Sequence, residues 1–195
     1  MKTVQKTLAF ITLLFLFSCS KDDDPITIIP IYFEENPLQS FLTTTGFNQQ
    51  TMVQTTTSGE LLAGISFKPT VKGKINSLLV QLPVINNNLE VSIWDDTTGN
   101  LLRQEIVNVS SANTQIEKQI TPLQLEKDKI YVISMQTNTA FVRYKTDQSN
   151  ASFPITAGNI QVLSYREGTN LTTIPTSNYY NLYAGDCIFK FQQTE

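Results

Sequence analysis

The chain has 195 residues, of which 16% are charged and 41% hydrophobic, and its formal net charge is −3. This low charge excludes a disordered acidic or basic tail, and the absence of histidine excludes Ser-His-Asp catalysis, Cys-His catalysis and histidine-containing zinc sites within the chain. Ser, Thr, Asn and Gln supply 69 residues and β-branched residues are abundant, a composition that favours pleated sheets over helical bundles.

The first 19 residues combine a basic head, an apolar run over residues 8–17, and then Ser18 and Cys19. The apolar run is shorter than the about 20 residues that span a bilayer, so we expect residues 1–18 to be a signal peptide that is removed. Residues 16–19 resemble the lipobox of bacterial lipoproteins, in which the Cys thiol is acylated. The resemblance implies that Cys19 is lipidated, and an ordinary secretory peptide is the alternative.

A lysine and three aspartates follow this cysteine after one serine: Lys21, Asp22, Asp23 and Asp24. Such a run resembles the surface-export signal of Bacteroidetes lipoproteins, and the serine is not the Asp typical of inner-membrane retention signals. The resemblance implies a protein of the outer membrane, held by its lipid and facing the cell exterior. A solvated acidic tether without a sorting role is the alternative.

Residues 19–37 are rich in acids and contain three prolines, and they predict an extended tether. Residues 38–195 have the size of one domain. Residues 1–18 hold two of the 14 basic residues and none of the 17 acidic ones, so the mature chain carries a net charge of −5. This charge disfavours nucleic acid as a partner.

Short runs of alternating apolar and polar residues dominate residues 38–195. The alternations at 78–82 and 89–93 are typical of half-buried strands. No stretch keeps a 3.6-residue period for three turns, and further strands are predicted at residues 52–57, 61–68, 101–109, 115–120, 129–136, 141–145, 160–166 and 187–192. These strands predict an all-β fold, an antiparallel two-sheet sandwich with a jelly-roll-like arrangement.

The last predicted strand places Cys187, Phe189 and Phe191 on one face. We expect this face to be the core. Because no histidine or cluster of bases accompanies Cys187, its thiol is expected to be buried and inert.

Five short motifs occur in order from residue 61 toward the C-terminus: Gly64-Ile65-Ser66-Phe67, Gly73-Lys74-Ile75, Val91-Ser92-Ile93-Trp94-Asp95 with Thr98-Gly99-Asn100-Leu101-Leu102, Pro122-Leu123-Gln124-Leu125, and Tyr131-Val132-Ile133-Ser134. This ordered set resembles an uncharacterised bacterial β-sandwich domain. Its hallmarks are a strand ending in Leu/Ile-Trp-Asp, a Thr-Gly hairpin and a later strand that begins with Leu-Gly-Tyr. The resemblance implies a cell-surface module, often attached to carbohydrate-active or adhesive proteins, and it carries over no catalytic residue. Asp128 or Lys129 stands where that family often has the glycine, so the turn before Tyr131 is expected to differ.

Trp94 is the only tryptophan of the chain, and strand parity places it on the face opposite Val91 and Ile93. On an exposed polar face, its ring would stack on a sugar ring. The alternative is that Trp94 covers the 95–99 hairpin or packs in the core.

Tyr179, Tyr180 and Tyr183 lie in or next to a stretch rich in Thr and Asn, residues 172–181. Aromatic and amide side chains together are typical of contact surfaces for glycans or proteins. These tyrosines are therefore the second candidate ligand site, and the alternative is that they cap the end of the sandwich.

Candidate chemistry beyond ligand binding is sparse. Residues 95–100 offer two carboxylates without the spacing of an EF-hand loop, and no acid pair stands out at a glycosidase separation. We expect no metal, no cofactor and no catalytic residue.

The sequence thus predicts a lipid-anchored, non-enzymatic surface β-sandwich that binds a glycan or protein. The alternatives are a structural or adhesive accessory subunit of a surface complex, and a glycosidase or lyase that works without histidine.

Overall fold

The computed structural model describes residues 30–47, 50–56 and 59–195, and Tyr32–Glu195 form one structural unit. The predicted lipid attachment at Cys19 and the predicted export signal at Lys21, Asp22, Asp23 and Asp24 lie outside the described residues.

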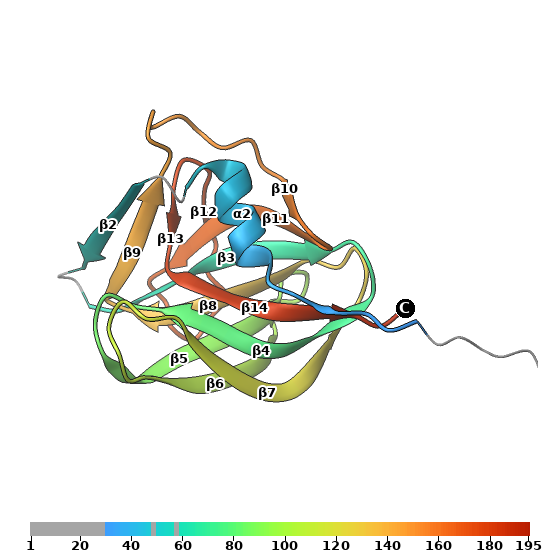
Figure 1. Ribbon diagram of the computed structural model, residues 1–195. Helices are drawn as coiled ribbons and strands as arrows, with labels where there is room; N and C mark the ends of the chain where they lie inside the picture. Colours follow the sequence, from blue (N-terminus) through green and yellow to red (C-terminus); the bar gives the residue numbers. More distant parts are fainter. Residues whose placement is uncertain (1–29, 48–49, 57–58) are drawn as a thin grey trace, which may run out of the picture. The chain divides into compact units, whose positions relative to one another are not determined.

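Antiparallel pairing builds three sheets in this unit (Figure 1). The four-stranded sheet has the order β1 (Glu34–Glu35), β14 (Asp186–Gln193), β4 (Gly73–Gln81) and β7 (Ile116–Leu125). The seven-stranded sheet has the order β10 (Ile155–Ala157), β11 (Ile160–Gly168), β3 (Leu61–Pro69), β8 (Tyr131–Thr137), β5 (Asn86–Asp95) and β6 (Leu101–Val109), and β12 (Ser177–Tyr179) also pairs with β11. The three-stranded sheet consists of β13 (Tyr183–Ala184), β9 (Thr139–Tyr144) and β2 (Gln50–Thr55).

The four-stranded and seven-stranded sheets enclose one large hydrophobic core. The predicted all-β fold, an antiparallel two-sheet sandwich, is confirmed. Every predicted strand has a counterpart, because alternation of apolar residues marks each strand that packs on the core. Cys187, Phe189 and Phe191 are fully buried, as predicted, and Phe189 packs on Phe67 with ring centroids 4.6 Å apart.

One helix, α2 (Pro37–Thr45), was not predicted. Asn36 caps its first turn by accepting a hydrogen bond from the Leu38 N–H, and Pro37 fits the first helical position, where no N–H is needed. Gly46 ends the helix with a φ of 75°, which a glycine adopts at little cost. Figure 1 shows α2 lying over β14. Among the described residues, no helix is long and apolar enough to cross a membrane.

The folded unit begins before the predicted boundary at residue 38. Glu34 and Glu35 pair with β14 as a short edge strand, and the Glu35 carboxylate accepts a hydrogen bond of 2.8 Å from the Asn159 N–H. Gln192 also donates to the Tyr32 carbonyl over 2.7 Å. These bonds fix residues 32–36 against the sandwich, so the structured part of the predicted tether belongs to the domain.

The turn before β8 contains a residue other than glycine with a left-handed backbone. Asp128 has a φ of 61°, a left-handed conformation that glycine adopts more easily, and its N–H donates to the Pro69 carbonyl over 2.8 Å. The Tyr131 hydroxyl accepts a hydrogen bond of 3.0 Å from the Glu126 N–H. The turn before Tyr131 is thus built around a left-handed Asp128.

Candidate functional site

Trp94 faces away from the large core, as strand parity predicts, but it is only 4% exposed. Leu171 and Ile174 pack over its ring, and its indole N–H donates to the Ser134 hydroxyl over 3.1 Å. The expectation that Trp94 presents an open stacking surface is therefore wrong. Its cause is a connection distant in sequence, residues 169–176 between β11 and β12, which covers this part of the outer sheet face.

This connection is held firmly at its base. The Arg166 guanidinium pairs with the Asp96 carboxylate through two nitrogens, one of them at 3.0 Å, and its Nε donates to Asn178 over 3.0 Å. A Cβ on Gly168 would lie 3.0 Å from the Pro175 backbone, which shows how closely the two ends of the connection approach. The cover over the indole is thus a packed part of the fold.

The three tyrosines do not form one surface. Tyr179 and Tyr180 are 37% and 49% exposed, whereas Tyr183 is fully buried. Tyr183 belongs to β13, which pairs with β9, and its ring packs edge-on against Phe41 of α2 at a centroid distance of 5.3 Å. The predicted exposure of Tyr183 is therefore wrong, because its strand lies under the helix.

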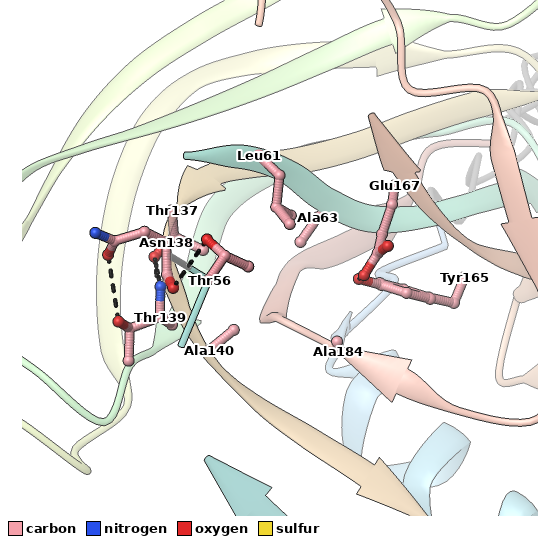
Figure 2. Close-up of a pocket in the computed structure, with 10 residues that line it drawn as sticks. All are labelled: Thr56, Leu61, Ala63, Thr137, Asn138, Thr139, Ala140, Tyr165, Glu167 and Ala184. Carbon is pink, nitrogen blue, oxygen red and sulfur yellow. Dashed lines mark hydrogen bonds between the residues drawn. The ribbon is translucent and has the colours of Figure 1, made fainter. Parts of the chain in front are cut away.

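A narrow cavity separates β3 from β9 and β13 (Figure 2). Its walls carry Ala63, Ala140 and Ala184, and the Tyr165 hydroxyl at one side donates to Glu167 over 2.6 Å. Burial raises the pKa of Tyr165, which keeps it a hydrogen-bond donor. The cavity volume is about 20 Å³, room for about one water molecule, so this space is too small for an organic ligand.

A second pocket lies beside α2 and has a volume of about 240 Å³. We call it the α2 pocket. It is assembled from the helix, the end of β4, the residue before β7, β9 and the start of β14, and its lining residues are Asn36, Leu38, Gln39, Leu42, Gln81, Gln115, Arg143 and Asp186. The lining is mainly polar, which distinguishes it from the cavity in Figure 2.

Arg143 and Asp186 form an ion pair at the base of the α2 pocket. Arg143 Nε donates to both carboxylate oxygens of Asp186, at 2.9 and 3.2 Å, and Nη2 donates to the same carboxylate. The Asp186 side chain is 1% exposed and that of Arg143 is 14% exposed. Burial raises the pKa of Asp186 and the guanidinium opposes that rise, while the hydrogen bonds to Asp186 raise the pKa of Arg143. The guanidinium contacts both carboxylate oxygens, so the two side chains form a charge-assisted pair.

Four carboxamides surround this pair. Gln81 lies directly opposite Asp186 in the β4–β14 ladder, and its amide donates to the Asn113 carbonyl over 2.9 Å. Asn36 uses its carbonyl oxygen to cap α2, which leaves its NH₂ group for other partners. Gln39 and Gln115 are exposed and make no side-chain hydrogen bond within the part of the chain that the structure describes.

Sequence reasoning missed the α2 pocket, although it singled out one residue next to it. Tyr183 pairs with Arg143 across the β13–β9 ladder and so lies next to the ion pair. The pocket residues come from five separate segments and form no motif. The one usable signal was Asn36-Pro37 followed by Gly46, which indicates a helix beside the last strand.

The described residues show no clustered metal ligands, since no three side chains of the types His, Cys, Asp and Glu come together in them. No protein-family model matches the chain, and no curated protein matches it significantly.

Proposed function

We propose that this protein is a lipid-anchored, non-enzymatic module of the outer cell surface that binds a glycan or protein ligand in the α2 pocket. The observation that carries the proposal is the pocket itself, about 240 Å³ of space lined by uncharged hydrogen-bonding groups around one neutralised ion pair. Ligand sites are concave, and a small number of placed polar groups fix the orientation of the ligand in them. The sequence of residues 1–24 supplies the support for lipid anchoring and surface export.

The chemistry of the side chains supports a non-enzymatic role. The chain has no histidine, and burial raises the pKa of the Cys187 thiol, which keeps it from being a thiolate. Asp186 is the single carboxylate among the lining residues, and Arg143 occupies both its oxygens. A second carboxylate would be needed for the usual glycosidase mechanism.

An accessory role in a surface complex is the second candidate, and exposed apolar side chains on β6 favour it. Leu102 and Ile106 are 38% and 49% exposed on this edge strand. Such exposed apolar groups are typical of protein contact surfaces when they gather in a patch. Replacing both with Ser would weaken assembly with a partner, whereas it would leave ligand binding in the α2 pocket unchanged.

The anchoring part is tested by replacing Cys19 with Ala. The wild type should incorporate labelled palmitate and fractionate with the outer membrane, and Cys19→Ala should do neither, because the acyl chains supply the membrane affinity. Protease treatment of intact cells then tests export. Wild type should be cleaved, and a variant with Asn at Asp22, Asp23 and Asp24 and Gln at Lys21 should be lipidated but protected. Equal cleavage of both versions would reduce this run to a tether.

The binding part is tested by blocking the pocket. Gln115→Trp should fill the mouth of the α2 pocket, and Gln124→Trp, an exposed glutamine at the other end of β7, is its matched control. The full-length protein in detergent is screened against neutral sugars, uronic acids, amino acids and short peptides. We expect at least one class to bind wild type and Gln124→Trp but not Gln115→Trp, and to be recovered chemically unchanged. If no class shows this pattern, and Gln39→Trp on α2 gives the same result, the proposed function fails.

A further inference from the structure

The charges of the α2 pocket narrow the class of ligand that fits it; this step rests on the proposed function. Arg143 and Asp186 are the only formally charged groups among its described lining residues, and they neutralise each other in a two-point contact. An anionic ligand that takes the guanidinium nitrogens now bonded to Asp186 would displace that carboxylate. A cationic ligand would have to compete with Arg143 for a carboxylate that is 1% exposed. Either would leave a buried charge without its partner, which is costly.

The carboxamides indicate what the pocket does recognise. Each carboxamide carries a donor and an acceptor on one side chain, and each hydroxyl group of a ligand also donates and accepts. Gln39 and Gln115 line the pocket, and their side-chain donors and acceptors have no hydrogen-bond partner among the described residues, so both are available to a ligand. Asn36 offers its NH₂ group. A ligand with several neighbouring hydroxyls satisfies these groups in pairs, whereas an apolar ligand would leave them without partners.

The helix supplies an apolar wall and the pocket sets a size limit. Leu38 and Leu42 are one turn apart on α2 and both line the pocket. Leu38 and Leu42 are 5% and 7% exposed, so a small apolar area of these side chains lies beside the hydrogen-bonding groups. A volume of about 240 Å³ is below the about 300–1,000 Å³ of pockets for drug-sized ligands, so the pocket suits about one ring.

We infer that the α2 pocket binds one neutral sugar ring, with Gln39, Gln115 and Asn36 bonded to its hydroxyls and its C–H face against Leu38 and Leu42. The Arg143–Asp186 pair stays intact when the sugar binds. The ligand class is thus an uncharged saccharide, whose terminal ring enters the pocket.

The experiment compares three sets of probes on the full-length protein in detergent by saturation-transfer NMR and competition titration. The probes are neutral methyl glycosides of common hexoses, the corresponding methyl uronides, and free amino acids. At least one neutral glycoside should bind wild type, with its ring C–H protons saturated most strongly. Gln39→Leu and Gln115→Leu should each weaken binding by about fivefold or more, the effect of one lost hydrogen bond, and Gln124→Leu should leave the affinity unchanged.

The possible results separate the two claims. If uronides or amino acids bind in a manner blocked by Gln115→Trp and neutral glycosides do not, this inference is overturned while the proposed function stands. If neutral glycosides bind equally to wild type, Gln39→Leu and Gln115→Leu, the site is elsewhere and the inference is also overturned. If no probe, sugar or peptide shows binding that Gln115→Trp blocks, both claims fail together.

Discussion

The surroundings of Trp94 and the α2 pocket are opposite in character. Trp94 is the aromatic side chain that a ligand site would be expected to use, yet Leu171 and Ile174 cover it and its N–H is already bonded to Ser134. The α2 pocket contains no aromatic side chain in its described lining, yet it is open and polar. The parity of a strand tells which face a side chain takes, but it does not tell whether a distant loop or helix covers that face.

The difference also lies in how each region uses an arginine and an aspartate. Arg166 and Asp96 hold the base of the connection that closes over Trp94. Arg143 and Asp186 lie at the edge of a space that remains open. An arginine–aspartate pair therefore lies beside a closed apolar cluster in one region and beside an open polar pocket in the other, and the surrounding side chains make the difference.

The largest expected effect is on the closed side. Trp94→Ala should lower the free energy of unfolding by about 3–5 kcal/mol, because it removes a large buried ring and leaves a cavity. Urea unfolding followed by far-ultraviolet circular dichroism measures it. Tyr180→Ala, at a 49% exposed site, should change stability by no more than about 0.5 kcal/mol. Equal stability of Trp94→Ala and wild type would mean that Trp94 is not part of a packed cluster.

On the open side, Asp186→Ala should cost about 3 kcal/mol, since it leaves the partly buried Arg143 guanidinium without its carboxylate. Removing both charges in Asp186→Ala/Arg143→Met should recover part of this loss. The double-mutant cycle from four unfolding curves gives the coupling between the two side chains. Strictly additive losses would contradict a direct pair.

Weakening the packing of residues 169–176 over Trp94 tests whether this loop keeps solvent from the indole. Ile174 is only partly buried, so Ile174→Ala should cost about 1–2 kcal/mol. Trp94 is the only tryptophan, so its fluorescence reports this cover alone. Acrylamide should quench wild type weakly and Ile174→Ala more strongly, while Gln115→Leu at the pocket should leave quenching unchanged. Strong quenching of wild type would show that the indole is already accessible.

The smallest effect concerns the carboxyl group next to Trp94. The Lys129 ammonium, at 2.7 Å, holds the pKa of Asp95 below its usual value, and the N–H groups of Thr97 and Thr98 act in the same direction. A depressed pKa in the folded state contributes stability that is present above the unfolded pKa of about 4 and lost as pH falls through the folded value. Asp95→Asn should therefore lose less stability than wild type between pH 5 and pH 2, measured from urea midpoints. An identical acid profile would show that the pair adds nothing.

The fold could be predicted from the sequence for strands in which the alternating apolar residues are also the buried ones. The buried face of the strand containing Cys187, Phe189 and Phe191 was predicted correctly. These side chains lie on the core side of the sheet in which β14 pairs with β4, so alternation along the strand was enough to identify them. Tyr183 was misplaced because its burial depends on β9 and on Phe41, which are 40 or more residues away. The helix was missed because nine residues give too few turns for a periodic signal.

The candidate site was harder to predict for a related physical reason. Gln39, Gln81 and Gln115 have no distinguishing pattern in the sequence. They line one pocket with Arg143 and Asp186 only because α2, the end of β4 and the residue before β7 come together in the fold. Trp94 was a candidate because of its residue type, and the sequence of β5 alone does not show that residues 169–176 cover it. Residue chemistry can be read from a sequence, whereas openness to solvent depends on packing between distant segments.

The short strand β1 is the part of the domain that a force applied from its N-terminal side would detach first. It pairs through two residues with β14 and stands at the edge of its sheet. A pull on the chain from the side of Tyr32 reaches these few hydrogen bonds before it reaches α2. Detaching residues 32–35 would release roughly 13 Å of extended chain at about 3.3 Å per residue, and it would leave Asn36 in place as the cap of α2. The sandwich and the α2 helix would keep their shape during that step, so β1 would detach before the rest of the domain unfolds.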